Sequence, residues 1–360
     1  MKREYSILIL GASYGSLLAT KLVLAGHAVK MVCLPAEAEL FNREGAIVRM
    51  PVKGSDDLVQ IESKNLPSKL SAGSPGDVDP AGYDLVALAM QEPQYGAPGV
   101  RELLDSIGRA RIPCMSIMNM PPLPYLRRIP GLDVDALRSA YTDATVWDNV
   151  DPAFITLCSP DPQAFRPPQE QANVLQVRLP TNFKAARFDS VEHTEMLRKL
   201  EADIEAIRFQ TGSGAAIPLP VKLKVHDSVF VPLAKWSMLL AGNYRCVEEA
   251  EMRSIRDAVH SDLDRTRSIY ETVGRVCMSL GAAEQDLVPF EKYANAALSL
   301  HSPSSVARAL ASGARDVERV DRLVQLVAGQ KGFASDELDE TVRVVDAWLR
   351  TNRQRAGASG

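Results

Sequence analysis

The stretch from residue 6 to residue 34 constrains the fold of this chain more than any other. It begins with the apolar run Ser6–Leu10, and residues 11–15 follow as a turn of small residues. Residues 16–25 then place apolar side chains at helical spacing, and residues 27–33 form a second apolar run. A strand, a glycine turn, a helix and a second strand make one βαβ unit. Such a unit presents a helix N-terminus at the end of its first strand, where the pyrophosphate of a dinucleotide binds.

The glycine turn departs from the G-x-G-x-x-G spacing that is usual in dinucleotide-binding folds. Read from Gly11, Ser13 and Ser16 replace the second and third glycines, and Gly15 lies between them. The backbone amides of serine still donate hydrogen bonds, so we expect Gly11, Ser13, Gly15 and Ser16 to bind a cofactor. The alternative is an ordinary βαβ unit that binds no nucleotide.

The composition limits the classes of partner and the cellular compartment. The 360 residues suffice for two or three domains, and the net charge of −4 gives no electrostatic basis for binding nucleic acid or an anionic membrane. Five widely spaced cysteines predict reduced thiols in a cytoplasmic protein, and no C-x-x-C pair or histidine cluster predicts a metal site. The N-terminal residues do not read as a signal peptide, because Glu4 precedes a very short apolar run. No apolar run is long enough to span a bilayer.

Alternating strands and helices predict an α/β domain with a parallel sheet over residues 1–220. The expected strands after the first unit are residues 46–50, 58–62, 84–90, 112–118, 154–158 and 173–179, the expected helices are 37–42, 97–107 and 191–207, and the expected loops are 66–81 and 159–169. A Gly/Pro/Ala stretch at 211–220 predicts a hinge. Residues 221–350 show helical periodicity and predict a mainly α-helical domain, and the polar residues 351–360 predict a disordered tail.

Four segments, in this order along the chain, resemble the ketopantoate reductase family. They are GSLLATKLVLAGHAVKMV in the first unit, WSMLLAGN from Trp236, SIYETVGRVCMSLGA from Ser268, and the pair Ser304-Ser305 followed by Gly313. The resemblance implies a Rossmann-type domain followed by a helical domain, with NADPH and a 2-oxo acid in the cleft between them. It also implies an NAD(P)-dependent oxidoreductase that reduces a small 2-oxo acid or a related carbonyl.

The sequence departs from the family at the positions that carry catalysis. Aligned on Trp236, the family's lysine and first asparagine fall on Met238 and Gly242. Aligned on Ser304, the family's aspartate and glutamate fall on Ala309 and Val317. Substitutes lie nearby: we expect Lys235, Asn243 and Glu318 to be catalytic, with Lys235 entering the cleft as proton donor. On a helix Lys235 is rotated by roughly 60° from Met238 and displaced ~4.5 Å along the axis.

Binding residues follow from the same comparison. Asn119 matches the family's asparagine after a strand, and Gln91 stands where the family has a lysine, so both are expected to contact the cofactor. Ser304 and Ser305 are expected to hold a substrate carboxylate. Each of three residues also has a purely structural alternative. Lys235 would be a solvated lysine, Glu318 would lie on a solvated charged helix face, and Ser304 would be a helix N-cap.

The resemblance favours NADP over NAD, although NAD stays open. The second strand ends near Leu34 and Pro35, where the family has a basic residue that would meet the 2′-phosphate. Lys30, Arg43 and Gln91 are the candidate replacements.

Two other functions compete with a 2-oxo acid reductase. An opine-type dehydrogenase would reduce an imine, with His226 beside Asp227 as the acid. A nucleotide-binding sensor or scaffold would have lost catalysis, as Met238 and Gly242 suggest. A second copy of the chain, in a homodimer, is the protein partner considered.

Overall fold

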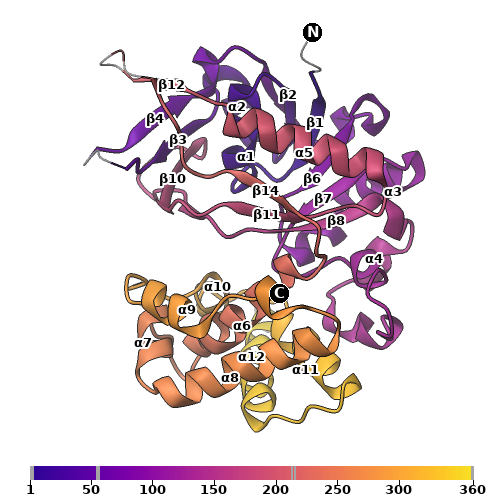
Figure 1. Ribbon diagram of the computed structural model, residues 1–360, viewed down its shortest axis with the longest axis vertical. Helices are drawn as coiled ribbons and strands as arrows, with labels where there is room; N and C mark the ends of the chain where they lie inside the picture. The colour runs from indigo at the N-terminus through magenta and orange to yellow at the C-terminus, as the bar shows by residue number, and fades with distance from the viewer. Residues whose placement is uncertain (1–3, 54–56, 212–213, 215, 358–360) are drawn as a thin grey trace. The chain divides into compact units, whose positions relative to one another are not determined.

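The computed structural model describes residues 4–53, 57–211, 214 and 216–357, and the chain forms two compact units (Figure 1). The first unit comprises the chain up to Met90 together with Gln94–Tyr125 and Val146–Asp227. The second comprises Gln91–Pro93, Leu126–Thr145 and the chain from Ser228 onward. The first unit extends past Pro220, where the sequence predicts the boundary, because residues 223–226 add a strand to its sheet.

An eight-stranded sheet forms the centre of the first unit. Its strands are β1 (Ser6–Leu10), β2 (Ala28–Val32), β5 (Leu70–Gly73), β6 (Leu85–Leu88), β7 (Cys114–Ile117), β8 (Ile155–Ser159), β11 (Phe183–Ala186) and β14 (Leu223–His226). Their order across the sheet is β14-β11-β8-β7-β6-β1-β2-β5. The six neighbouring strands β8, β7, β6, β1, β2 and β5 are parallel to one another. Numbered along the chain, these six parallel strands are ordered 3-2-1-4-5-6, which is the Rossmann order. The Rossmann-type fold is therefore confirmed.

Helices cover this sheet because its strands are apolar on both faces. The helices of the unit are α1 (Gly15–Leu24), α2 (Pro35–Glu44), α3 (Val100–Ala110) and α5 (Val191–Glu205). Helix α1 packs against α5, and both contribute to one buried core with the central strands (Figure 1). Even Lys21 of α1 is buried, and its ammonium donates to the carbonyl of Pro220 at 2.9 Å.

Several short strands lie where the sequence predicts loops. Strand β5 falls within the predicted loop 66–81, and β9 (Gln163–Phe165) falls within the predicted loop 159–169. Both lie at the edge of a sheet, where a strand needs fewer apolar residues. Strand β9 belongs to a second sheet with β4 (Val59–Glu62), β3 (Ile47–Met50) and β10 (Val174–Leu179). Strand β13 (Ala216–Ile217) lies inside the predicted hinge and pairs with β12 (Phe209–Gln210), which precedes it.

The second unit is helical, as predicted. Its helices are α6 (Lys235–Met238), α7 (Ile255–His260), α8 (Leu263–Ser279), α9 (Phe290–Ala297), α10 (Ser305–Ala311), α11 (Val320–Gln330) and α12 (Asp336–Gly357), and the short α4 (Leu123–Leu126) lies where the chain passes between units. After Phe230, the described residues contain no strand, and the β-pairing there is one bridge between Val247 and Met252.

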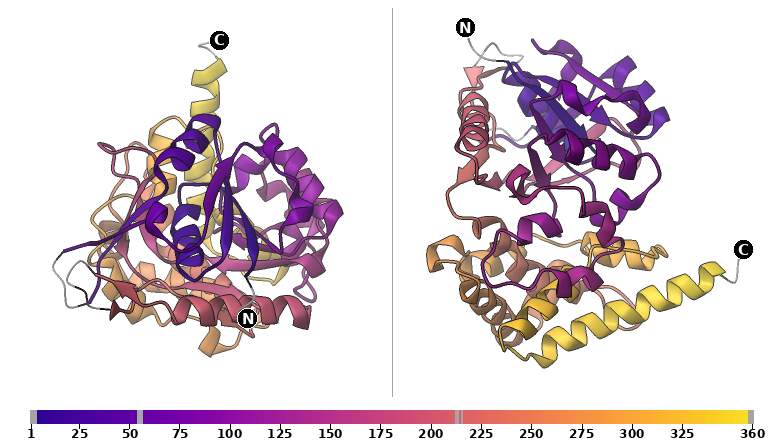
Figure 2. Two further views of the ribbon diagram at one scale, coloured as in Figure 1. Left: turned by 90° about the horizontal axis from the view of Figure 1, so that it is seen from above. Right: turned by 90° about the vertical axis from the view of Figure 1, so that its right-hand side faces the viewer.

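Helix α12 corrects the predicted tail. It continues as one long helix through residues 351–357, which the sequence predicts to be disordered (Figure 2). Leu349 and Asn352 are buried, and the Asn352 amide donates to the carbonyls of Leu310 and Ala314, so this part of the helix is anchored. Residues 358–360 lie outside the described chain. None of the helices that the structure describes combines the length and apolarity needed to cross a bilayer.

Candidate functional site

The turn after β1 requires both of its glycines. Gly11 has φ +102°, and its amide donates to the carbonyl of Val32 at 2.9 Å. A Cβ atom on Gly11 would lie 2.6 Å from the carbonyl oxygen of Ala89, and one on Gly15 would lie 2.7 Å from the Ile9 side chain. The turn therefore packs directly against the ends of β1 and β6.

The N-terminus of α1 suits a bound phosphate. Within the described chain, no side chain caps this helix, and its first turn carries no acidic residue. Its leading amides thus lack acceptors within the helix, and the dipole presents positive charge there. Ser13 is exposed in the turn, and the Ser16 hydroxyl donates to the Ser13 carbonyl at 2.8 Å. These residues fit the pyrophosphate of a dinucleotide.

Asn119 and Gln91 differ in their placement. Asn119 follows β7 closely, is half-buried and belongs to the first unit, at the carboxyl edge where α/β sheets bind ligands. Gln91 is exposed and lies in the short segment Gln91–Pro93 that groups with the helical unit. Contact of either residue with a cofactor stays a prediction.

The basic residue beside the end of β2 is Arg166, which the sequence analysis missed. Lys30 donates instead to the carbonyl of Asp77 at 3.1 Å, and Arg43 pairs with Glu44. Arg166 forms an ion pair with Glu37 in the first turn of α2, and its positive charge also acts on the Cys33 thiol. Its Nη2 is buried and has no hydrogen-bond partner among the described residues. Arg166 comes 129 residues after Glu37, so no local pattern reveals the pairing.

A π-helical turn contains both Gly242 and Asn243. Residues Leu239–Asn243 follow α6 in this conformation, which adds one residue to a helix without ending it. A Cβ atom on Gly242 would lie 1.9 Å from the Tyr293 hydroxyl, so this position accepts only glycine while Tyr293 donates to the Met238 carbonyl.

Contacts around this turn join three of the predicted site residues. The Ser304 hydroxyl donates to the Asn243 carbonyl at 2.6 Å and accepts from the Ala307 amide at 3.2 Å, which caps α10. Its single proton is thus used by the backbone, which favours the capping role for Ser304. The Tyr244 hydroxyl donates to the carbonyl of Glu318, so Glu318 contacts the residue that directly follows Asn243.

Glu318 is buried beside a second carboxyl group, that of Glu92. The Glu92 amide donates to Glu318 Oε1 at 3.4 Å, and Glu92 Oε1 accepts from the Thr142 amide at 3.0 Å. Glu92 is 1 % exposed, and within the described chain its Oε2 has no hydrogen-bond partner. Burial, with a further contribution from the charge of Glu318, raises the pKa of Glu92 to about 7. Glu92 is not among the residues predicted from the sequence, because a glutamate separated from its partner by 226 residues gives no local signal.

The remaining predicted residues have different surroundings. Lys235 begins α6 and is half-buried, beside the fully buried Trp236. Ser305 is exposed on α10. Asp227 is paired with Arg198. Among the described residues, no group of three His, Cys, Asp or Glu side chains is arranged to hold a metal ion.

Comparison with solved structures identifies the fold over nearly the whole chain. The 2-dehydropantoate 2-reductase from Methylococcus capsulatus has a TM-score of 0.65 and 13% identity, with 96% of this chain and 97% of that chain covered. A ketopantoate reductase of the PanE/ApbA family from Ralstonia eutropha has a TM-score of 0.61 and 14% identity, with 97% and 99% covered. A dimeric ketopantoate reductase from Staphylococcus aureus has a TM-score of 0.54 and 12% identity, with 96% and 99% covered. No protein-family model and no curated protein matches this sequence.

Proposed function

We propose that this protein is an NADPH-dependent reductase of a small 2-oxo acid, a divergent relative of the ketopantoate reductases. The observation that carries this proposal is the combination of a Rossmann unit with an uncapped α1 N-terminus and a helical unit, in a fold shared with ketopantoate reductases along the chain. NAD stays the alternative cofactor, because Glu37 lies beside Arg166 at the end of β2.

The chain's own residues supply binding and proton transfer. The bound nicotinamide cofactor would supply the hydride that reduces the substrate carbonyl. The turn of Gly11, Ser13, Gly15 and Ser16 would hold its pyrophosphate. Lys235 would stabilise the negative charge that develops on the substrate oxygen and donate the proton that completes the hydroxy acid.

Asn243 and Glu318 support this chemistry from the π-helical turn. The Asn243 side chain makes no hydrogen bond within the described chain, so its amide is available to a polar substrate group. Glu318 is buried next to Glu92, whose pKa is raised to about 7, so Glu92 exchanges its proton near neutral pH. We propose that Asn243 binds substrate and that Glu318 orients the reacting groups, with Ser305 as the exposed hydroxyl for a carboxylate.

Substitution of Lys235 tests the proposal. NADPH oxidation is measured with a panel of 2-oxo acids, with and without amines, for wild type, Lys235→Met and Lys292→Met as an exposed-lysine control. Loss of one preorganised electrostatic group typically lowers kcat ~10²–10³-fold, so Lys235→Met should lose most turnover at unchanged NADPH affinity. Lys235→Arg should restore little, because guanidinium is a poor proton donor.

Other outcomes favour the competing functions. Full activity in Lys235→Met would make Lys235 a surface residue and overturn its role. Turnover that needs both an oxo acid and an amine would favour an opine-type dehydrogenase, although the pairing of Asp227 with Arg198 disfavours it. Cofactor binding with no turnover on any substrate would favour a sensor or scaffold.

A homodimer is the assembly we propose. The Staphylococcus aureus ketopantoate reductase with this fold is described as dimeric. Light scattering after size-exclusion chromatography should give twice the 39.3 kDa chain mass, and a mass that stays monomeric at all concentrations would contradict it.

A further inference from the structure

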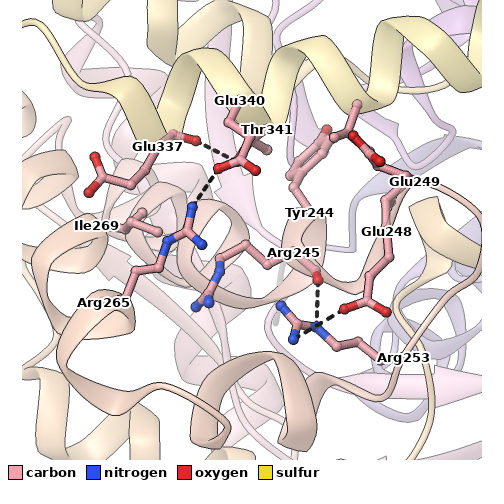
Figure 3. Close-up of a pocket in the computed structure, with 12 residues that line it drawn as sticks. Tyr244, Arg245, Glu248, Glu249, Arg253, Arg265, Ile269, Glu337, Glu340 and Thr341 are labelled. Carbon is pink, nitrogen blue, oxygen red and sulfur yellow. Dashed lines mark hydrogen bonds and ion pairs between the residues drawn. The ribbon is translucent and has the colours of Figure 1, made fainter.

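The helical unit contains a pocket of about 280 Å³ that none of the proposed catalytic residues lines. Its walls come from residues 244–253, from α8 and from α12 (Figure 3). Three arginines, Arg245, Arg253 and Arg265, project into it, and Figure 3 shows the guanidinium group of Arg245 between the other two. Arg253 and Arg265 are paired with pocket glutamates, so Arg245 is the guanidinium group whose charge calls for a negative partner.

Arg245 is the buried member of the three, with 9 % of its surface exposed. Its Nη1 donates to the Thr266 hydroxyl at 2.6 Å and to the Ala241 carbonyl at 3.3 Å. Within the described chain it forms no ion pair with a carboxylate, and its Nε and Nη2 make no hydrogen bond. Burial, followed by repulsion from Arg253 and Arg265, lowers the pKa of Arg245. A buried guanidinium without a counter-ion is costly unless a ligand supplies one.

The other two arginines are held by carboxylates at the pocket rim. Arg253 pairs with Glu248 at 3.3 Å, and Arg265 pairs with Glu340 at 2.5 Å. Both pairs are partly exposed and therefore weak, so Arg265 can turn toward a ligand at small cost. Arg253 is also held by its Nε, which donates to the Arg245 carbonyl at 3.0 Å. Arg245 has no such partner and supplies the fixed positive charge.

The acidic lining restricts the charge of the ligand. Four glutamates, Glu248, Glu249, Glu337 and Glu340, line the pocket with the three arginines, so its formal charge is negative by one. A dianion such as phosphate would be repelled more strongly than a single carboxylate. The parallel Nε–H and Nη2–H groups of a guanidinium also match the two oxygens of a carboxylate.

We propose that this pocket binds a small carboxylate-bearing metabolite, with Arg245 as its central anchor and Arg253 and Arg265 as secondary contacts. The ligand fills a space that the proposed reaction does not use. Ile269 and Val344 on the same walls provide apolar contact for its carbon skeleton.

The test measures binding of acetate to the full-length protein. Isothermal titration and thermal shift are recorded with sodium acetate and with inorganic phosphate, against sodium chloride at equal ionic strength. We expect saturable acetate binding and weaker phosphate binding. Arg253→Gln and Arg265→Gln, at partly exposed sites, should each weaken acetate binding roughly tenfold, since each removes one charged donor.

Two further variants distinguish acetate binding in the pocket from nonspecific attraction of acetate to positive charge. Arg267→Gln on α8 removes a partly exposed arginine that pairs with Glu291 outside the pocket, and it should bind acetate like wild type. Arg245→Lys keeps the positive charge but lacks the two parallel N–H donors of the guanidinium group. If this variant folds, it should not bind acetate. Absence of saturable acetate binding, tighter binding of phosphate, or equal weakening in Arg267→Gln would overturn the proposal.

Discussion

Glu92 is a single residue of the candidate site that makes the stability of the protein depend on pH. Its carboxyl group is buried, accepts a hydrogen bond from the Thr142 amide and lies near Glu318 and Tyr141. The pKa of Glu92 is raised from 4.5 to about 7, so the folded state holds a proton that the unfolded chain releases above pH 4.5. This group's contribution to stability is therefore fully present below pH 4.5 and is lost as the pH rises to about 7.

Glu92→Gln should remove this pH dependence, because the amide stays neutral at every pH. Relative to wild type, the variant should gain free energy of unfolding between pH 5 and pH 8, by an amount on the order of 3 kcal/mol at most. Urea unfolding at the two pH values measures the gain. Glu195→Gln, at an exposed position of α5, is the control and should show no such gain. A constant difference between Glu92→Gln and wild type would contradict the ionisation assigned here.

At the scale of elements, the π-helical turn after α6 is the feature that sets the packing around Asn243. It contains Asn243 and places Gly242 against the Tyr293 hydroxyl. Local periodicity does not reveal such an inserted residue, since its apolar neighbours continue the same helical face. The sequence therefore predicts a helix here without showing the π-helical turn that contains Asn243.

Gly242→Ala tests that packing. The added methyl group would meet the Tyr293 hydroxyl, and overpacking of this kind costs about 1–3 kcal/mol, more than the helix propensity gained. In a Tyr293→Phe background the cost should be smaller, because the hydroxyl is gone. Gly329→Ala in α11, where a Cβ atom meets nothing within 4 Å, should be neutral or stabilising in the same urea unfolding experiment. Equal costs in both backgrounds would show that Tyr293 does not restrict Gly242.

The end of β2 gives a test of cofactor choice. The 2′-phosphate of NADPH would bind Arg166 and be repelled by Glu37, whereas the ribose hydroxyl of NADH would donate to Glu37. Arg166→Gln should weaken NADPH binding roughly tenfold or more, and Glu37→Gln should strengthen it. Fluorescence titration measures both, with Arg43→Gln on α2 as a control. If Glu37→Gln weakens NADH binding while Arg166→Gln has no effect, the site prefers NAD.

For the whole molecule, the sequence predicts the Rossmann core and the helical unit because both depend on local periodicity. Strand β1, helix α1 and strand β2 carry strong apolar patterns, as do β6 and β7. Strand β5 was missed because an edge strand with Ser71 and Gly73 resembles a loop.

The candidate site is predictable only where its residues are close in sequence. Gly11 and Gly15 belong to one turn and were identified as a pair. Arg166 and Glu92 acquire their surroundings from residues far along the chain, so folding alone brings these charges together.

The central claim is that this chain is a dinucleotide-dependent reductase, and a fluorescence titration of the wild-type protein with NADPH and with NADH tests it most directly. The account predicts saturable binding of both cofactors or of NADPH alone, with NADPH the tighter, at the turn of Gly11 and Gly15. Tighter binding of NADH would contradict the choice of NADP. The absence of binding by either dinucleotide would contradict the proposed function itself.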